Sequence, residues 1–154
     1  MNIRLSAAGR EDLSAINKIQ KLAFKESFDK YGFCPAFESE DEHLASYLEW
    51  ARIYKILAGE ELVGSIFIYK ADENHYEIDS ISVIPEYQNF GIGSIAITLV
   101  ESRHPDARLW TLATPDSDLR NRHFYEKLGY VEYDVEEINS ALKLIRYKKE
   151  KALL

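Results

Sequence analysis

Residues 81–94 have the sequence ISVIPEYQNFGIGS, in which a run of branched residues leads into a loop with two glycines. The branched residues from Tyr76 to Ile84 are typical of a buried strand. Pro85 ends that strand, because proline cannot donate a hydrogen bond to a sheet ladder. A helix is predicted from about Ile92 to Arg103, before Pro105. The segment therefore predicts a strand, a loop and a helix in direct succession.

The loop in this segment has features of an anion site. Gly91 and Gly93 permit unusual dihedral angles and a close approach of the backbone to a ligand. The N–H groups of the first helical turn have no intrahelical partner, and the helix dipole adds partial positive charge, which suits phosphate. No Lys-Ser/Thr pair follows, which argues against a P-loop, and the glycines are too few for a dinucleotide fingerprint. On the glycines alone, a tight turn without a ligand fits equally well.

Short strands and helices are predicted on both sides of this segment. Before it lie a strand at Ile3–Ala7, a helix from Glu11 onward, a second helix with a capping box at Ser39 and Glu42 and a buried stripe of Leu44, Tyr47, Leu48 and Ala51, and strands at Tyr54–Ala58 and Leu62–Tyr69. After it lie a strand at Arg108–Thr114, a helix at Asp118–Leu128 that Gly129 ends, and strands at Val131–Val135 and Ala141–Lys148. Strand–helix–strand units predict some parallel pairing, and hairpins predict antiparallel pairing. We therefore expect one domain over residues 1–154, of the α/β (α+β) class, with a mixed sheet and helices on both faces.

The composition argues against several classes of protein. The net charge of −7 disfavours nonspecific binding to nucleic acid or to an anionic membrane, which needs clustered Lys and Arg. No apolar run is long enough for a membrane span, and the start lacks the apolar stretch of a signal peptide, so we expect a cytoplasmic protein. The single cysteine, Cys34, cannot form an intramolecular disulfide, and the scattered histidines lack metal-ligand spacing, so no metal is expected.

Two motifs resemble those of a known family. Val83-Ile84-Pro85 followed by Gln88-Asn89-Phe90-Gly91-Ile92-Gly93 resembles the acetyl-CoA-binding motif of GNAT N-acetyltransferases, which is V-x-P and then Q/R-x-x-G-x-G/A at a helix start. Residues 121–130, NRHFYEKLGY, are similar to the family's F-Y-E-K-x-G-F/Y helix. The motifs occur in the family order, and the predicted elements cover nearly the whole family fold. The resemblance implies a GNAT-like, mostly antiparallel sheet of six to seven strands with helices on both faces.

The resemblance also implies a site for acetyl-CoA as co-substrate. The amides from Gln88 to Ser94 are expected to hold the pyrophosphate, and backbone groups of Ile81 and Val83 to pair with the pantetheine arm. The family's usual asparagine on the second motif helix falls at Asp118 here, so Asn121 is either a cofactor contact or simple helix surface. The implied cofactor-binding residues are Ile81, Ser82, Val83, Gln88, Asn89, Phe90, Gly91, Ile92, Gly93, Ser94, Asn121 and Phe124.

The candidate catalytic residues are a tyrosine and a carboxylate. Tyr125 occupies the family's general-acid position, where it would protonate the departing thiolate, although a core aromatic is the alternative. Glu77 matches a position where several family members carry the base, and period-two geometry puts Asp79 on the same strand face as the second candidate. Either carboxylate could instead bind a cationic acceptor, or lie at an exposed strand end.

The resemblance implies an N-acetyltransferase that acts by direct attack of an amine on acetyl-CoA in a ternary complex. The acceptor is a small-molecule or a protein amine, and a homodimer is left open. The loop at residues 33–37, FCPAF, either walls the acceptor pocket or packs between helices. No base is tied to Cys34 by sequence, and direct transfer needs no acyl-cysteine. The alternative function is a non-catalytic acyl-CoA-binding module.

Overall fold

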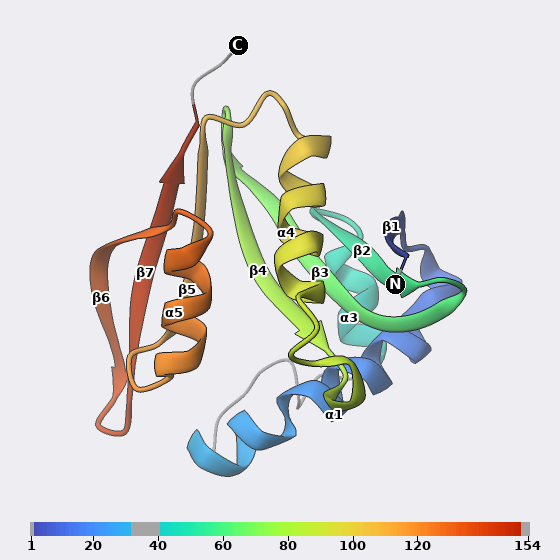
Figure 1. The fold of residues 1–154 in the computed structure, drawn as a ribbon, viewed down its shortest axis with the longest axis horizontal. Coiled ribbons are helices and arrows are strands. Elements are labelled where there is room, and N and C mark those ends of the chain that lie inside the picture. Colours follow the sequence, from blue (N-terminus) through green and yellow to red (C-terminus); the bar gives the residue numbers. More distant parts are fainter. Residues whose placement is uncertain (1, 32–40, 152–154) are drawn as a thin grey trace.

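A computed structural model describes residues 2–31 and 41–151 (Figure 1). Its elements are β1 (Ile3–Ala7), a 3-10 turn (Arg10–Asp12), α1 (Leu13–Tyr31), α3 (Asp41–Tyr47), β2 (Ala51–Ala58), β3 (Glu61–Asp72), β4 (His75–Val83), a second 3-10 turn (Pro85–Tyr87), α4 (Ile92–Arg103), β5 (Leu109–Pro115), α5 (Leu119–Lys127), β6 (Val131–Asn139) and β7 (Leu142–Glu150). The predicted succession of strand, loop and helix at residues 81–94 is confirmed. The predicted order of strands and helices is confirmed as well.

The strands form one mixed sheet of seven strands in the order β1-β2-β3-β4-β5-β7-β6. Neighbouring strands are antiparallel except for β4 and β5, which are parallel and are joined through α4. Strand β7 lies between β5 and β6. After β5 the chain passes through α5 to β6 at the edge of the sheet, and it then returns as β7 to pair with β5. The expected mixed, mostly antiparallel sheet is therefore confirmed.

The two parallel strands pair over a short distance. Residues 75–77 of β4 lie opposite residues 109–111 of β5, and no further pairs follow. The rest of β5 continues to pair with β7 as far as Pro115. Figure 1 shows β4 leaning away from β5 beyond this junction. One backbone edge of β4 is consequently left without a β5 partner from Ile78 to Val83, directly before the loop.

The strand β4 contains a bulge at Asp79. Ile78 and Ser80 pair with consecutive residues of β3, so Asp79 has no partner in that register. A bulge of one residue shifts the alternation of side chains along a strand. Accordingly Ile78 and Ile81 both contact the core cluster that contains α4, although they are three residues apart. The regular period of two is interrupted at Asp79, but Asp79 still lies within electrostatic reach of Glu77.

Hydrophobic residues fill both faces of the sheet. The larger cluster joins the sheet to α4 and α5 and includes Ile97, Val100 and Tyr125 from those helices. The smaller cluster joins it to α1 and α3 and consists of Leu13, Ile16, Leu44, Ile53 and Phe67. Figure 1 shows α4 and α5 in front of the sheet and α3 behind it, as expected for helices on both faces.

Some element boundaries differ from those predicted. Ala51 was expected on the buried stripe of the second helix, but α3 ends at Tyr47 and Ala51 pairs with Tyr69 as the first residue of β2. Three tightened i→i−3 bonds, from residues 48–50, close the helix before the strand begins. The strand β6 continues to Asn139, because its ladder with β7 extends through acidic residues that carry no hydrophobic signal. Ser39, Cys34 and the loop at residues 33–37 lie outside the described residues.

In the part of the chain that the structure describes, no helix combines the length and the apolar character that crossing a membrane requires.

Candidate active site

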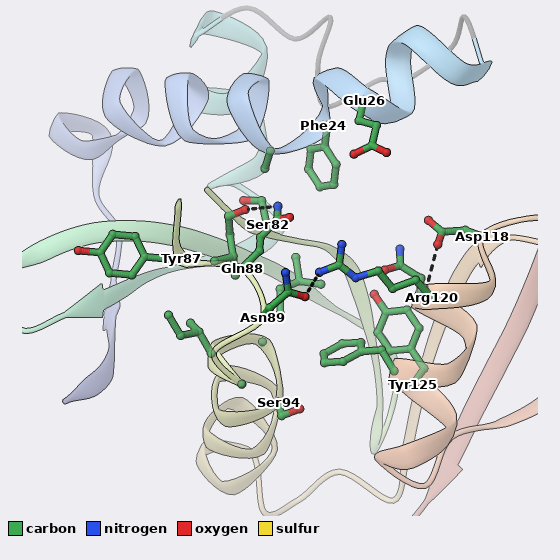
Figure 2. Close-up of a pocket in the computed structure, with 18 of the residues that line it drawn as sticks. Phe24, Glu26, Ser82, Tyr87, Gln88, Asn89, Ser94, Asp118, Arg120 and Tyr125 are labelled. Atoms are coloured by element: carbon green, nitrogen blue, oxygen red, sulfur yellow. Dashed lines mark hydrogen bonds between the residues drawn. The ribbon is translucent and has the colours of Figure 1, made fainter. Parts of the chain in front are cut away.

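A hollow of about 440 Å³ lies where the open edge of β4 meets the glycine-bearing loop (Figure 2). Its walls come from α1, β4, the loop, the first turn of α4 and one side of α5. Of the predicted cofactor-binding residues, all line this hollow except Phe90. Phe90 is 63% exposed on the outside of the loop. The structure thus gathers residues from two distant motifs around one cavity.

The loop backbone is shaped by hydrogen bonds and by left-handed residues. The Gln88 side chain donates from Nε2 to the Val83 carbonyl at 2.9 Å, which ties the loop to the strand. Asn89 and Gly91 have φ values of 69° and 76°. Gly91 is the N-cap of α4 and supplies no side-chain cap, so the N–H groups of the first helical turn are not covered by a capping side chain. They are available to a ligand with negative charge.

Glycine is needed at position 93 for a different structural reason than at position 91. Gly93 lies within α4, and a Cβ atom there would approach Cζ of Phe124 to 3.0 Å. That distance is tighter than ordinary contact, so glycine lets the ring of α5 rest directly on α4. The sequence prediction of an unusual dihedral angle therefore holds at Gly91, whereas Gly93 serves close packing.

Helix α5 is held at both ends by its own sequence. At the start, Asp118 accepts a hydrogen bond from the Asn121 N–H at 3.0 Å. At the end, Gly129 has a φ of 95°, and the N–H groups of Gly129 and Tyr130 donate to the carbonyls of Glu126 and Tyr125. This is a Schellman arrangement, and the rings of Tyr125 and Tyr130 meet beside it at 6.2 Å. The last turn of α5, which carries Tyr125, is therefore firmly positioned.

The side chain of Tyr125 is buried, with 7% of its surface exposed, and it lines the hollow. Figure 2 shows its hydroxyl directed into the cavity. Burial raises the pKa of this phenol, and the charge of Asp118 raises it further. The group is therefore protonated at neutral pH and can donate a proton or a hydrogen bond.

The hollow also contains charged residues that sequence reasoning missed. Arg120 donates from Nη2 to Oδ1 of Asn89 at 2.6 Å and so links α5 to the loop across the cavity (Figure 2). The lining also includes Lys30, Glu26 and Asp118. Arg120 stands one residue before the second motif segment and could have been found from that position. The α1 residues gave no signal, because nothing in the pattern of that helix points to a ligand.

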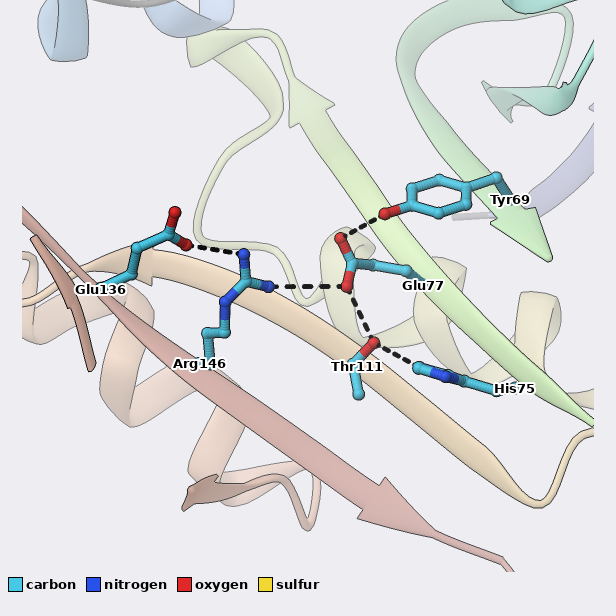
Figure 3. Close-up of polar contacts among 6 residues, drawn as sticks. All are labelled: Tyr69, His75, Glu77, Thr111, Glu136 and Arg146. Carbon is cyan, nitrogen blue, oxygen red and sulfur yellow. Dashed lines mark hydrogen bonds and ion pairs between the residues drawn. The ribbon is translucent and has the colours of Figure 1, made fainter. Parts of the chain in front are cut away.

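Glu77 lies outside this hollow, in a polar network at the junction of β4 and β5 (Figure 3). Its Oε2 accepts a hydrogen bond from the Tyr69 hydroxyl at 2.8 Å, and its Oε1 accepts one from Thr111 at 2.9 Å. Nη1 of Arg146 approaches Oε1 to 3.8 Å, and His75 contacts the Thr111 hydroxyl at 2.8 Å. Both carboxylate oxygens of Glu77 are therefore engaged by neighbours.

Asp79 differs from Glu77 in having a free carboxylate. It is exposed, and it forms no hydrogen bond or ion pair with the described residues. The surrounding protein raises the pKa of Asp79 by desolvation, and the charge of Glu77 adds to the rise. Because the side chain still contacts water, solvent offsets part of this effect. Asp79 is thus a carboxylate without a partner among the described residues, and its proton affinity is above the ordinary value.

Across residues 2–31 and 41–151, no group of three or more His, Cys, Asp or Glu side chains is arranged to hold a metal ion.

Comparison with known sequences gives two matches that span most of the chain. A family model described as "Acetyltransferase (GNAT) family" matches residues 15–130, which include both motif segments. The uncharacterized protein YrkN of Bacillus subtilis strain 168 is 31% identical over 132 residues, which cover 82% of this chain and 71% of that protein.

Comparison with solved structures shows the same fold. The PaiA N-acetyltransferase of Thermoplasma acidophilum, in complex with coenzyme A, matches with a TM-score of 0.77 at 18% identity, over 97% of this chain and 100% of that one. A GNAT family acetyltransferase of Elizabethkingia anophelis with acetyl-CoA bound matches with a TM-score of 0.74 at 18% identity, over 97% and 99% of the two chains.

Proposed function

Since this chain belongs to the GNAT acetyltransferase family, we propose that it transfers an acetyl group from acetyl-CoA to an amine by direct attack in a ternary complex. The observation that carries the proposal is the single hollow formed by the open edge of β4, the loop before α4 and the Tyr125 hydroxyl. These features supply hydrogen bonds for an extended amide-containing arm, N–H donors for phosphate and a proton donor for a leaving group. The PaiA structure, whose fold this chain shares, contains coenzyme A.

The pantetheine arm is assigned to the edge of β4. Without a β5 partner, the backbone groups from Ile81 to Val83 can pair with the amides of an extended ligand, as in strand addition. Ser82 contributes through its backbone, because its side-chain hydroxyl is buried against that of Ser65 at 2.9 Å. The pyrophosphate is assigned to the N–H groups of the loop and of the first turn of α4.

Arg120 is assigned to a phosphate group of the cofactor. It reaches the loop from α5, and its guanidinium fits the geometry of a phosphate in two parallel hydrogen bonds. The existing bond to Asn89 holds the side chain at the loop before a ligand enters. Lys30 of α1 supplies a second cation to the lining. These charges favour a polyanionic cofactor on a chain whose net charge is −7.

Tyr125 is assigned the role of general acid. In the reaction the amine nitrogen forms a bond to the acyl carbon, and the bond from that carbon to sulfur breaks. The sulfur takes the proton of the Tyr125 hydroxyl, and the proton of the attacking nitrogen leaves to a base. The raised pKa keeps this buried phenol protonated until the carbon–sulfur bond breaks. Because it also makes the phenol a weaker acid, the proton passes to sulfur only as negative charge develops there.

Neither Asp79 nor Glu77 lines the hollow, and the base is assigned to Asp79 because its carboxylate has no hydrogen-bond or ion-pair partner among the described residues. Glu77 accepts bonds at both oxygens and lies near the Arg146 guanidinium, so accepting a proton would disrupt an existing network. Asp79 has no such partners and a raised pKa, which suits proton acceptance from an ammonium group. Glu77 then acts beside it, as a fixed negative charge that favours an approaching cation.

An acceptor screen with acetyl-CoA, in which thiol release is followed, tests the proposed function. We expect thiol release above the acetyl-CoA background with at least one class among alkyl amines, amino sugars and peptide amines. Calorimetric titration with CoA runs in parallel. If CoA binds but no amine raises thiol release at any pH, the chain is a non-catalytic acyl-CoA-binding module and the transferase proposal is wrong.

A further inference from the structure

A second hollow, of about 520 Å³, lies away from the loop and shares no lining residue with the first. It is bounded by the end of α4, the start of β2, the end of β3 and the start of β4. Arg103 and His104 contribute from the end of α4, whereas the phosphate loop lies at the opposite end of that helix. Its volume falls in the range of ordinary small-molecule sites.

Three cationic side chains line this second hollow. The side chains of Arg52 and Lys70 form no hydrogen bond or ion pair with any residue that the structure describes. Arg103 is fixed by a bond from Nη2 to the Leu5 carbonyl at 2.7 Å. The described lining contains one acidic residue, Glu49. On a chain with a net charge of −7, this is a local excess of positive charge.

The state of His104 agrees with this charge distribution. The side chain is buried, and its Nε2 lies 3.0 Å from the Tyr54 hydroxyl. Burial lowers the pKa of His104, and the charges of Arg52 and Arg103 lower it as well, against the opposing charge of Asp106. Asp106 is itself bonded by the Tyr76 hydroxyl at 2.9 Å. His104 is therefore uncharged at neutral pH, so it adds no charge to that of the three cationic side chains.

Aromatic rings form the remaining wall of the second hollow. Trp50 is 54% exposed, which is unusual for so large a ring, and it is held in place by Tyr47 at 4.8 Å and Tyr69 at 5.4 Å between ring centroids. Tyr76 is stacked on the buried Trp110 at 5.2 Å. A planar ligand can therefore place a ring on Trp50 without rearranging the protein.

We propose that this second hollow is a binding site for a small aromatic anion, with its ring against Trp50 and its charged group held by Arg52 and Lys70. Arginine recognises phosphate and carboxylate alike, through two parallel hydrogen bonds, and Lys70 adds a point charge. Arg103, held by its bond to the Leu5 carbonyl, adds a further positive charge to the lining. The ligand class joins a delocalised ring to a phosphate or a carboxylate, and it differs from the cofactor and from an amine acceptor.

Calorimetric titration of the CoA-saturated protein tests this site, with phenyl phosphate, benzoate and inorganic phosphate as probes. Saturation with CoA removes binding at the first hollow. We expect saturable binding of phenyl phosphate or of benzoate at about millimolar concentration, and weaker binding of inorganic phosphate, which lacks a ring. The two aromatic probes distinguish a phosphate ligand from a carboxylate ligand.

Matched double variants locate the site. Arg52→Gln with Lys70→Gln should weaken binding of the aromatic probe by about tenfold or more, because hydrogen bonds to charged groups are lost. Arg4→Gln with Lys143→Gln removes the same charge from exposed residues outside the hollow and should leave the affinity unchanged. Trp50→Ala should weaken phenyl phosphate but not inorganic phosphate. Unchanged CoA affinity verifies that each variant is folded.

Three results would overturn the assignment. The first is no saturable binding of either aromatic probe to the wild-type protein. The second is an equal loss in both double variants, which would indicate net charge rather than a site. The third is an unchanged affinity for phenyl phosphate in Trp50→Ala, which would show that Trp50 does not bind the ring of the ligand.

Discussion

Replacement of Gly91 tests the link between backbone conformation and cofactor binding. Gly91 has a φ of 76°, and a Cβ atom built on it would meet nothing within 4 Å. Substitution therefore imposes no clash, and the whole penalty comes from the left-handed conformation. For an ordinary residue that penalty is about 1–2 kcal/mol. It is smaller for asparagine, which enters this region readily, and larger for β-branched valine.

The penalty must appear either in folding or in CoA binding. If the loop keeps its shape, the free energy of unfolding falls by about 1–2 kcal/mol and CoA affinity is retained. If the loop relaxes, the N–H groups turn away from the phosphate and affinity falls by about tenfold for each 1.4 kcal/mol. The sum of the two losses should increase in the order Gly91→Asn, Gly91→Ala, Gly91→Val.

Chemical denaturation of the free protein and calorimetric titration with CoA measure the two losses. Gly91→Asn is the matched control, since it adds a side chain but tolerates the conformation. A valine variant with wild-type stability and wild-type CoA affinity would refute the assignment of the loop. An asparagine variant as impaired as valine would show that bulk, and not backbone conformation, is the cause.

Four further predictions concern the charged and acidic groups of the site. Tyr125→Phe should leave CoA affinity nearly unchanged and lower kcat by roughly a hundredfold if the hydroxyl protonates sulfur. A near-normal kcat, measured where chemistry limits the rate, would mean that Tyr125 serves only in core packing. Arg120→Ala should weaken CoA by about tenfold. It should weaken 3′-dephospho-CoA much less if Arg120 meets the 3′-phosphate, and equally if Arg120 meets the pyrophosphate; wild-type CoA affinity in the variant would remove Arg120 from phosphate binding. Asp79→Asn should lower kcat, with a loss that shrinks as rising pH deprotonates the amine, whereas Glu77→Gln should chiefly raise KM; a pH series of both constants with the reverse pattern would make Glu77 the base. Desolvation by the surrounding protein raises the pKa of Asp79 above its ordinary value of 3.8. The contribution of this group to stability is therefore fully present below the pKa of the unfolded state and is lost as pH rises through the folded pKa. The denaturation midpoint of Asp79→Asn should rise relative to that of the wild type over that range, and a constant difference would contradict the shift.

The local elements were predictable because their signals are local. Pro85, the glycines of the loop and Gly129 each act on the backbone within a few residues, and the boundaries of α4 agree with the prediction. The second motif helix was similarly defined, by Asp118 at its start and the Schellman turn at its end. The two motifs together predicted that Gln88 and Tyr125 belong to one site, and both residues line the same hollow in the structure.

The remaining features depend on contacts between distant segments. The bulge at Asp79 arises from the register with β3, which a single strand does not encode. The Glu77 carboxylate contacts Tyr69, Thr111 and Arg146, which come from three other strands. Its contacts could therefore not be predicted from the sequence of its own strand. The end of the second helix was misplaced because the period of its apolar residues continues through Ala51 into β2.

The short junction between β4 and β5 has a consequence for how the molecule holds together. Three residue pairs connect the block β1-β2-β3-β4 to the block β5-β7-β6 by backbone hydrogen bonds. The blocks are also joined by the polar network around Glu77 and by apolar packing, since Trp110 and Tyr147 of one block share a cluster with Ile66 and Ile78 of the other. An extended ligand that pairs with the free edge of β4 would therefore lie where the backbone hydrogen bonds between the two blocks end.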